Sequence, residues 1–171
     1  MVVVSVLLAP EDDVSPLLSR LQIHWLASAD ANLHLALLVC LADAPEESMP
    51  GDVDLVRRLE EGVRALNAKY GHGDSGPFHL LHRRRRWNAG EGCWMGWERK
   101  RGKLHELNRL LRGATDTTFM SWAGRSPVAP ADVRYVITLD SDTRLPRDTV
   151  RRLIGKMAHP LNRARFDPAK Q

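Results

Sequence analysis

Two aspartates near the end of the chain, Asp140 and Asp142, directly follow an apolar run at residues 136–139. Because side chains alternate along a strand, carboxylates at positions i and i+2 point to the same side of a strand end. Two carboxylates held close together repel each other, and Mg²⁺ or Mn²⁺ relieves that repulsion by taking oxygen ligands. A metal so placed could neutralise a diphosphate leaving group. The spacing therefore predicts metal ligands, and the alternative is an Asp-Ser-Asp turn whose side chains cap local backbone amides.

Positive charge is concentrated in residues 83–112, which carry 10 Lys and Arg against 3 acidic residues, in a chain whose formal net charge is only +4. Within this segment Arg99, Lys100, Arg101 and Lys103 open a predicted helix, where cations oppose the helix dipole. A bound anion would stabilise such an arrangement, since helix N-termini and basic side chains both favour phosphate. The segment is therefore predicted to face phosphate, and a solvated basic face is the alternative.

The same segment also allows a nucleic-acid surface, because Trp87, Trp94 and Trp97 lie among its basic residues. The second hypothesis for function is accordingly a non-catalytic module that binds nucleic acid or another polyanion through residues 83–112. Its acidic residues count against this hypothesis, and we expect no nucleic-acid partner.

Composition excludes several classes of protein. A length of 171 residues suggests about one domain. Two cysteines, Cys40 and Cys93, exclude a disulfide-stabilised mini-protein. The longest apolar stretches are far shorter than a membrane span, and the N-terminus lacks the basic region of a signal peptide. Zinc-ligand spacing, a Walker loop, a dinucleotide fingerprint and a serine elbow are not found.

The elements that must position these residues alternate along the chain. Strands are predicted at residues 2–8, 33–41, 78–81 and 133–139. Helices are predicted from Asp12 or Asp13 to about Trp25, from a capping Asp52 to Tyr70, at residues 98–112 and at residues 148–159. Residues 83–96 are predicted to be a long irregular loop. This order predicts an α/β fold, an open, mostly parallel sheet with helices on both faces, in which ligands bind beyond the carboxyl ends of the strands.

Several longer motifs resemble the glycosyltransferase region of bacterial cyclic β-1,2-glucan synthases. They are FHLLHRRRRWN at residues 78–88, GEG at 90–92, WMGWERKRGKLHELN at 94–108, YVITLDSDTRLP at 135–146 and KMAHPLN at 156–162. The resemblance covers nearly the whole chain. It implies that residues 1–171 are the N-terminal, donor-binding part of a GT-A-like nucleotide-sugar domain whose sheet is incomplete at its C-terminus. It also implies UDP-glucose as the donor and a linear or cyclic β-1,2-glucan as the product of an inverting glycosyltransferase.

The resemblance assigns roles to individual residues. Asp140 and Asp142 match the metal-binding D-x-D, which would hold Mg²⁺ or Mn²⁺, and Asp140 would also bind the donor. Lys103 and Asn108 match a Gly-Lys…Leu-Asn element beside the nucleotide, and Arg101 is expected to assist at the diphosphate. Asp43 falls where such folds contact uridine. The sequence departs from the family pattern at Cys40, where an aspartate is expected.

No catalytic residue is assigned within the chain. The resemblance implies that the general base lies beyond Gln171, together with a Gln-x-x-Arg-Trp acceptor motif. The isolated chain is therefore expected to bind UDP or UDP-glucose at most and to transfer no glucose. Its implied partners are a β-glucan acceptor and the remainder of the synthase polypeptide. The implied location of that full-length enzyme is the cytoplasmic face of the bacterial inner membrane.

Overall fold

The computed structural model describes residues 1–71, 76–120, 127 and 129–162. Its main sheet contains four parallel strands in the order β3-β2-β1-β6. These strands are β1 (Val2–Leu8), β2 (Leu35–Leu41), β3 (Phe78–Arg83) and β6 (Ile137–Asp140). Val2 lies opposite Leu35 of β2, and Ser5 lies opposite Asp140 of β6. The predicted open parallel sheet is confirmed, and its carboxyl ends share one edge.

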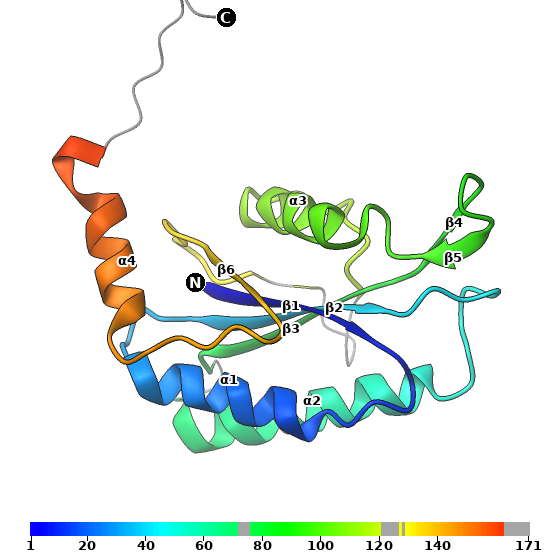
Figure 1. The fold of residues 1–171 in the computed structure, drawn as a ribbon, viewed down its shortest axis with the longest axis horizontal. Helices are drawn as coiled ribbons and strands as arrows, with labels where there is room; N and C mark the ends of the chain where they lie inside the picture. Colours follow the sequence, from blue (N-terminus) through cyan, green and yellow to red (C-terminus); the bar gives the residue numbers. More distant parts are fainter. Residues whose placement is uncertain (72–75, 121–126, 128, 163–171) are drawn as a thin grey trace, which may run out of the picture.

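Helices cover both faces of the sheet, as predicted (Figure 1). Two of them pack side by side on one face, and a third lies alone on the opposite face. The fourth follows β6 and contacts the first helix beside the sheet. In order along the chain they are α1 (Ser15–Ser28), α2 (Asp52–Tyr70), α3 (Arg99–Leu111) and α4 (Thr149–Ala158), with a 3₁₀ turn at Pro160–Asn162.

Alternating side chains of the central strands divide the interior into two cores. Val2, Val4 and Val6 of β1 pack with the apolar faces of α1 and α2. Val3 points the other way, into the cluster that contains Leu107 of α3. All seven residues of β2 are buried, which is typical of a parallel strand covered on both faces. Burial of each Val or Leu side chain contributes about 1.5–3 kcal/mol, so this alternation fixes which face each helix covers.

The segment after β3 differs from its predicted structure. Residues 83–96, predicted to be irregular, contain an antiparallel hairpin of β4 (Arg86–Asn88) and β5 (Cys93–Met95). Ala44, just after β2, anchors this hairpin by exchanging two backbone hydrogen bonds with Trp94, at 2.9 and 2.8 Å. Two three-residue strands are too short to show the alternation by which a strand is identified from sequence.

Smaller differences concern the ends of elements. Helix α1 begins at Ser15, after Val14 rather than after a capping aspartate, and β6 begins at Ile137 rather than at 133. Helix α2 follows Gly51, whose φ of 89° requires glycine. Asp52 is not the cap of α2: its carboxylate accepts the N–H of Met49, which precedes the helix, at 2.8 Å.

The sequence predicts neither a membrane span nor a disulfide framework. Among the residues that the structure describes, every helix is too short or too polar to cross a membrane. Cys40 is buried and Cys93 is half-buried, and both are free thiols.

Candidate functional site

A small pocket lies where the carboxyl ends of the central strands meet the first turn of α3. Its volume is about 230 Å³. The strands contribute Ser5, Val6, Leu7 and Cys40; the following loops contribute Asp43, Gly96 and Ser141; and α3 contributes Arg99, Lys100 and Lys103. This is the edge at which open parallel sheets bind ligands. The pocket therefore contains Asp43 and Lys103, and it is bordered by Ser141, the residue next to Asp140.

Lys103 is the most deeply buried charge of this pocket, with 3% of its surface exposed. Its ammonium donates to the carbonyl of Val6 at 2.6 Å and to that of Leu38 at 3.4 Å. Burial lowers the pKa of Lys103 from its usual value, although the two carbonyls stabilise the charged form. An ammonium has three N–H donors, so one is left for a ligand oxygen among the contacts that the structure describes.

Two ion pairs join α3 to the strand ends around the pocket. Arg99 Nη2 lies 2.7 Å from Asp43 Oδ2, after β2. Lys100 Nζ pairs with Asp140 Oδ1, at the end of β6. Both pairs are solvent-accessible, so each contributes little stability and is readily exchanged for a ligand. The two carboxylates therefore lie beside cations that a bound diphosphate could also use.

The backbone entering α3 adopts an uncommon conformation that orients these cations. Glu98 and Arg99 both have positive φ, 51° and 44°. Left-handed backbone costs a non-glycine residue roughly 1–2 kcal/mol, and such residues cluster at ligand-binding sites. Glu98 occupies the N-cap position without a side-chain capping hydrogen bond, and the first turn contains no acidic residue. Arg99, Lys100 and Arg101 therefore lie at the positive end of the helix dipole.

The structure does not bring all the predicted residues into the pocket. The Arg101 side chain is 81% exposed and pairs with Glu98, one turn back on the helix, at 2.6 Å. Asn108 is exposed farther along α3, and neither residue lines the pocket. Asp142 is exposed in the turn after β6, two residues beyond Asp140. Of the residues predicted for the site, Arg101, Asn108 and Asp142 therefore lie outside the pocket.

Asp140 ends β6 and Asp142 lies in the turn that follows, and both are exposed. The Asp140 side chain is 64% exposed and already faces a cation, Lys100. The described residues contain no cluster of three or more His, Cys, Asp or Glu side chains that could hold a metal. Mg²⁺ commonly binds through one or two carboxylates, with waters and substrate phosphates completing its shell. A metal held by Asp140 and Asp142 would therefore be of this open kind, with the phosphates of a ligand completing its shell.

Arg83 and Arg85 are structural, which corrects, for these two residues, the prediction that segment 83–112 faces phosphate. Arg83 is 1% exposed and lies 2.6 Å from Glu106 of α3. It also donates to the carbonyl of Trp97 from both terminal nitrogens, at 3.1 Å. Arg83 ends β3, Arg84 and Arg85 join it to β4, and along this link Arg83 and Arg85 are buried while Arg84 and Arg86 remain exposed. Arg83 therefore fixes the start of α3 over the sheet.

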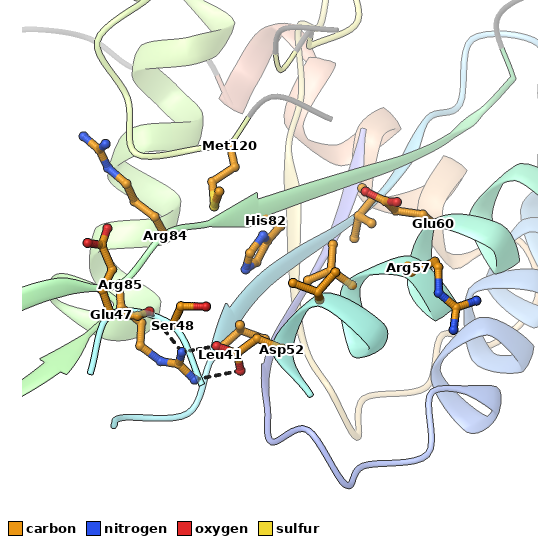
Figure 2. Close-up of a pocket in the computed structure, with 13 residues that line it drawn as sticks. Leu41, Glu47, Ser48, Asp52, Arg57, Glu60, His82, Arg84, Arg85 and Met120 are labelled. Carbon is orange, nitrogen blue, oxygen red and sulfur yellow. Dashed lines mark hydrogen bonds and ion pairs between the residues drawn. The ribbon is translucent and has the colours of Figure 1, made fainter. Parts of the chain in front are cut away.

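Arg85 performs a similar task for the loop after β2. Its guanidinium donates to Asp52 Oδ2 at 2.5 Å and Oδ1 at 3.2 Å, and to the carbonyls of Ala42 at 2.6 Å and Glu47 at 3.2 Å. Figure 2 shows this pair at one end of a largely apolar cavity of about 490 Å³ between α2 and β3. Because Asp43 follows Ala42 directly, Arg85 also fixes the Asp43 side of the pocket.

Arg99 and Lys100 line the pocket together with Lys103, whereas Arg101, which was selected with Lys103 as a donor-binding residue, does not. Helical spacing was the sequence signal that could have distinguished these residues. Arg99 and Lys100 lie four and three positions before Lys103 and share its face, whereas Arg101 lies two positions before it and points away. The structure follows this rule.

Comparison with known proteins relates the chain to a glucan synthase. No family model matches the chain. Over all 171 residues the chain is 47% identical to the cyclic beta-(1,2)-glucan synthase NdvB of Rhizobium meliloti (strain 1021). The chain spans 6% of the length of that relative. The resemblance predicted from the sequence motifs is confirmed, and the chain is related to a segment of a glucan synthase.

Proposed function

We propose that the chain contains the donor-binding region of a GT-A-type glycosyltransferase that takes UDP-glucose and builds β-1,2-glucan. One observation carries the proposal: the structure gathers Asp43, Lys103 and the Lys100–Asp140 pair at the carboxyl ends of parallel strands. The 47% identity to a segment of a glucan synthase supports the choice of sugar and linkage. The confirmed α/β architecture is compatible with a GT-A domain.

In this proposal each side of the pocket holds one part of the donor. Asp43 lies at the side where uridine would bind, and Lys103 offers its remaining N–H to a phosphate oxygen. Arg99 and Lys100 exchange their carboxylate partners for the diphosphate, at small cost because their ion pairs are exposed. Asp140 and Asp142 would hold Mg²⁺ or Mn²⁺, which when bound neutralises the departing diphosphate.

Transfer with inversion requires a base that removes the proton of the acceptor hydroxyl. We propose that this base and part of the acceptor site are supplied by other regions of a full-length synthase. That synthase would act at the cytoplasmic face of the inner membrane. The isolated 171-residue chain is then expected to bind UDP and UDP-glucose and to release no glucan from UDP-glucose.

Calorimetric titration of the chain with UDP, with and without Mn²⁺, tests the donor site. Asp142→Ala is expected to abolish the Mn²⁺-dependent gain in affinity. Asp116→Ala is the matched control, because Asp116 is an exposed aspartate whose partner, Arg109, lies at the far end of α3. Equal Mn²⁺ dependence in wild type and Asp142→Ala would contradict the metal assignment. Glucan synthesis by the isolated chain would contradict the proposed need for further residues.

A further inference from the structure

A wider groove adjoins the donor pocket and is formed by the β4–β5 hairpin and the start of α3. Its volume is about 810 Å³, within the usual range of ligand sites. Trp87 and Trp97 both line it, and Arg99 lines both this groove and the donor pocket. A ligand in the groove would therefore reach the place where the donor sugar is expected.

Two indole rings are unusually accessible here. Trp87 is 54% exposed and Trp97 is 46% exposed, so neither is accounted for by core packing. Each ring is braced by another aromatic ring in an edge-on arrangement. Trp87 lies 6.1 Å from Trp94, and Trp97 lies 6.0 Å from His105, between ring centroids. Braced, exposed indoles offer a large contact surface that loses little conformational entropy on binding.

The backbone carrying both rings is held rigidly. Trp94 is joined to Ala44 by two hydrogen bonds, which fixes the hairpin to the end of β2. The carbonyl of Trp97 accepts from the buried Arg83. Gly102 of α3 lies directly against that carbonyl, where a Cβ atom would be 1.9 Å from the oxygen. The two rings are therefore preorganised before any ligand arrives.

The charges of the groove are balanced. It is lined by two cations, Arg86 and Arg99, and by two carboxylates, Glu91 and Glu98. Arg99 is moreover paired with Asp43, and Glu98 with Arg101. A phosphate backbone needs a net positive surface. A neutral sugar chain instead presents apolar C–H faces that stack on indole rings, and hydroxyl groups that pair with both carboxylates and guanidinium groups.

We propose that this groove binds the growing glucan chain, with sugar rings stacked on Trp87 and Trp97 and hydroxyl groups bonded to Arg86 and Glu91. The inference rests on the proposed function for the identity of the sugar. It adds a second, acceptor-side site within this chain, beside the donor pocket and on the other side of Arg99.

Calorimetric titration with a linear β-1,2-linked gluco-oligosaccharide, without UDP or metal, tests the groove. The wild-type chain is expected to bind it saturably. Trp87→Ala and Trp97→Ala are each expected to weaken binding at least about fivefold, the usual effect of removing an aromatic anchor. Leu26→Ala, an equally exposed apolar side chain on α1, is the control and should bind as wild type does. Unchanged thermal unfolding would show that the variants are folded, and Trp87→Phe should retain part of the affinity.

Absence of saturable oligosaccharide binding by the wild-type chain, or unchanged affinity in both tryptophan variants, would overturn the inference. Titration with single-stranded oligothymidylate at two salt concentrations tests whether the groove binds nucleic acid instead. The inference would also be overturned if the chain bound oligothymidylate more tightly than the oligosaccharide and if that binding depended on the two tryptophans. A parallel UDP titration separates the two proposals. Oligosaccharide binding without UDP binding would support the groove and contradict the donor site, and the opposite result would overturn the groove alone.

Discussion

Arg83 and Glu106 form an ion pair of 2.6 Å that is almost wholly withdrawn from water, between the end of β3 and α3. The Glu106 carboxylate also accepts the N–H of Thr118 at 3.0 Å and its hydroxyl at 2.6 Å. The pair therefore connects three separate segments of the chain. Since α3 carries Lys100 and Lys103, this contact sets the position of the two pocket-lining cations relative to the strand ends.

Removing one partner of this pair should destabilise the fold severely. Arg83→Met leaves the Glu106 carboxylate buried without its cation, which typically costs about 3–5 kcal/mol in the free energy of unfolding. Urea denaturation followed by circular dichroism measures the change. Arg84→Met, at the exposed neighbouring position, is the control and should stay within about 0.5 kcal/mol of wild type. Equal stabilities of the two variants would contradict a structural role for Arg83. If Arg83→Met does not fold, adding Glu106→Leu should restore part of the stability, because it removes the unpaired charge.

The helical face of each cation should decide its effect on nucleotide affinity. Lys100→Ala and Arg99→Ala each remove a charge at the pocket and should weaken UDP binding about tenfold, the usual value of one charge-assisted hydrogen bond. Arg101→Ala removes the same charge from the opposite face and should change the affinity less than about twofold. Calorimetry at constant low ionic strength gives the three constants. An equal loss in all three variants would indicate general electrostatic attraction instead of specific contacts.

Two helical glycines should respond to alanine in opposite directions. At Gly102 a Cβ atom would lie 1.9 Å from the Trp97 carbonyl oxygen, which Arg83 holds in place, so Gly102→Ala should cost about 1–3 kcal/mol. At Gly155 of α4 a Cβ atom meets nothing within 4 Å. Gly155→Ala should therefore stabilise the chain by about 0.5–1 kcal/mol through its higher helix propensity. The midpoint of thermal unfolding should fall in Gly102→Ala and rise in Gly155→Ala. A stabilised Gly102→Ala would show that α3 can shift away from Trp97.

Acid should destabilise the chain through two half-buried histidines on β3, His79 and His82. Burial lowers the pKa of His79 and of His82 to about 4, and the neighbouring His34 adds to the effect at His79. The unfolded chain binds these protons near pH 6.5 and the folded chain does not, so stability is complete above that pH and falls between about 6.5 and 4. Each histidine contributes a slope of at most about 1.4 kcal/mol per pH unit.

Urea denaturation at several pH values measures this slope. His79→Gln should reduce it, whereas His159→Gln, at an exposed position after α4, should leave it unchanged. An unaltered slope in His79→Gln would contradict the contribution of His79 to the acid destabilisation.

The sequence predicted the order and direction of the main elements because long apolar runs and amphipathic helices are local signals. The helix predicted from a capping Asp52 to Tyr70 matches α2 at its C-terminal bound, and its cap was placed one residue late. The hairpin was missed because its strands are three residues long, and its position depends on Ala44, about 50 residues earlier. Arg83 and Arg85 were misinterpreted because charge is visible in sequence but burial is not. Their partners, Glu106 and Asp52, are 23 and 33 positions away, and only the fold brings them together.

The attachment between Ala44 and Trp94 is made by backbone atoms alone. Side chains at the tip and outer face of the hairpin are therefore free to change without releasing it from the sheet. In a scaffold of this kind, residues that contact a ligand can change without a loss of stability. Substitutions at Trp87 or Glu91 could change which oligosaccharide the proposed groove binds, while Asp43 and its neighbours keep their positions at the end of β2. The hairpin is accordingly the segment to diversify when a library of altered glycan specificity is wanted.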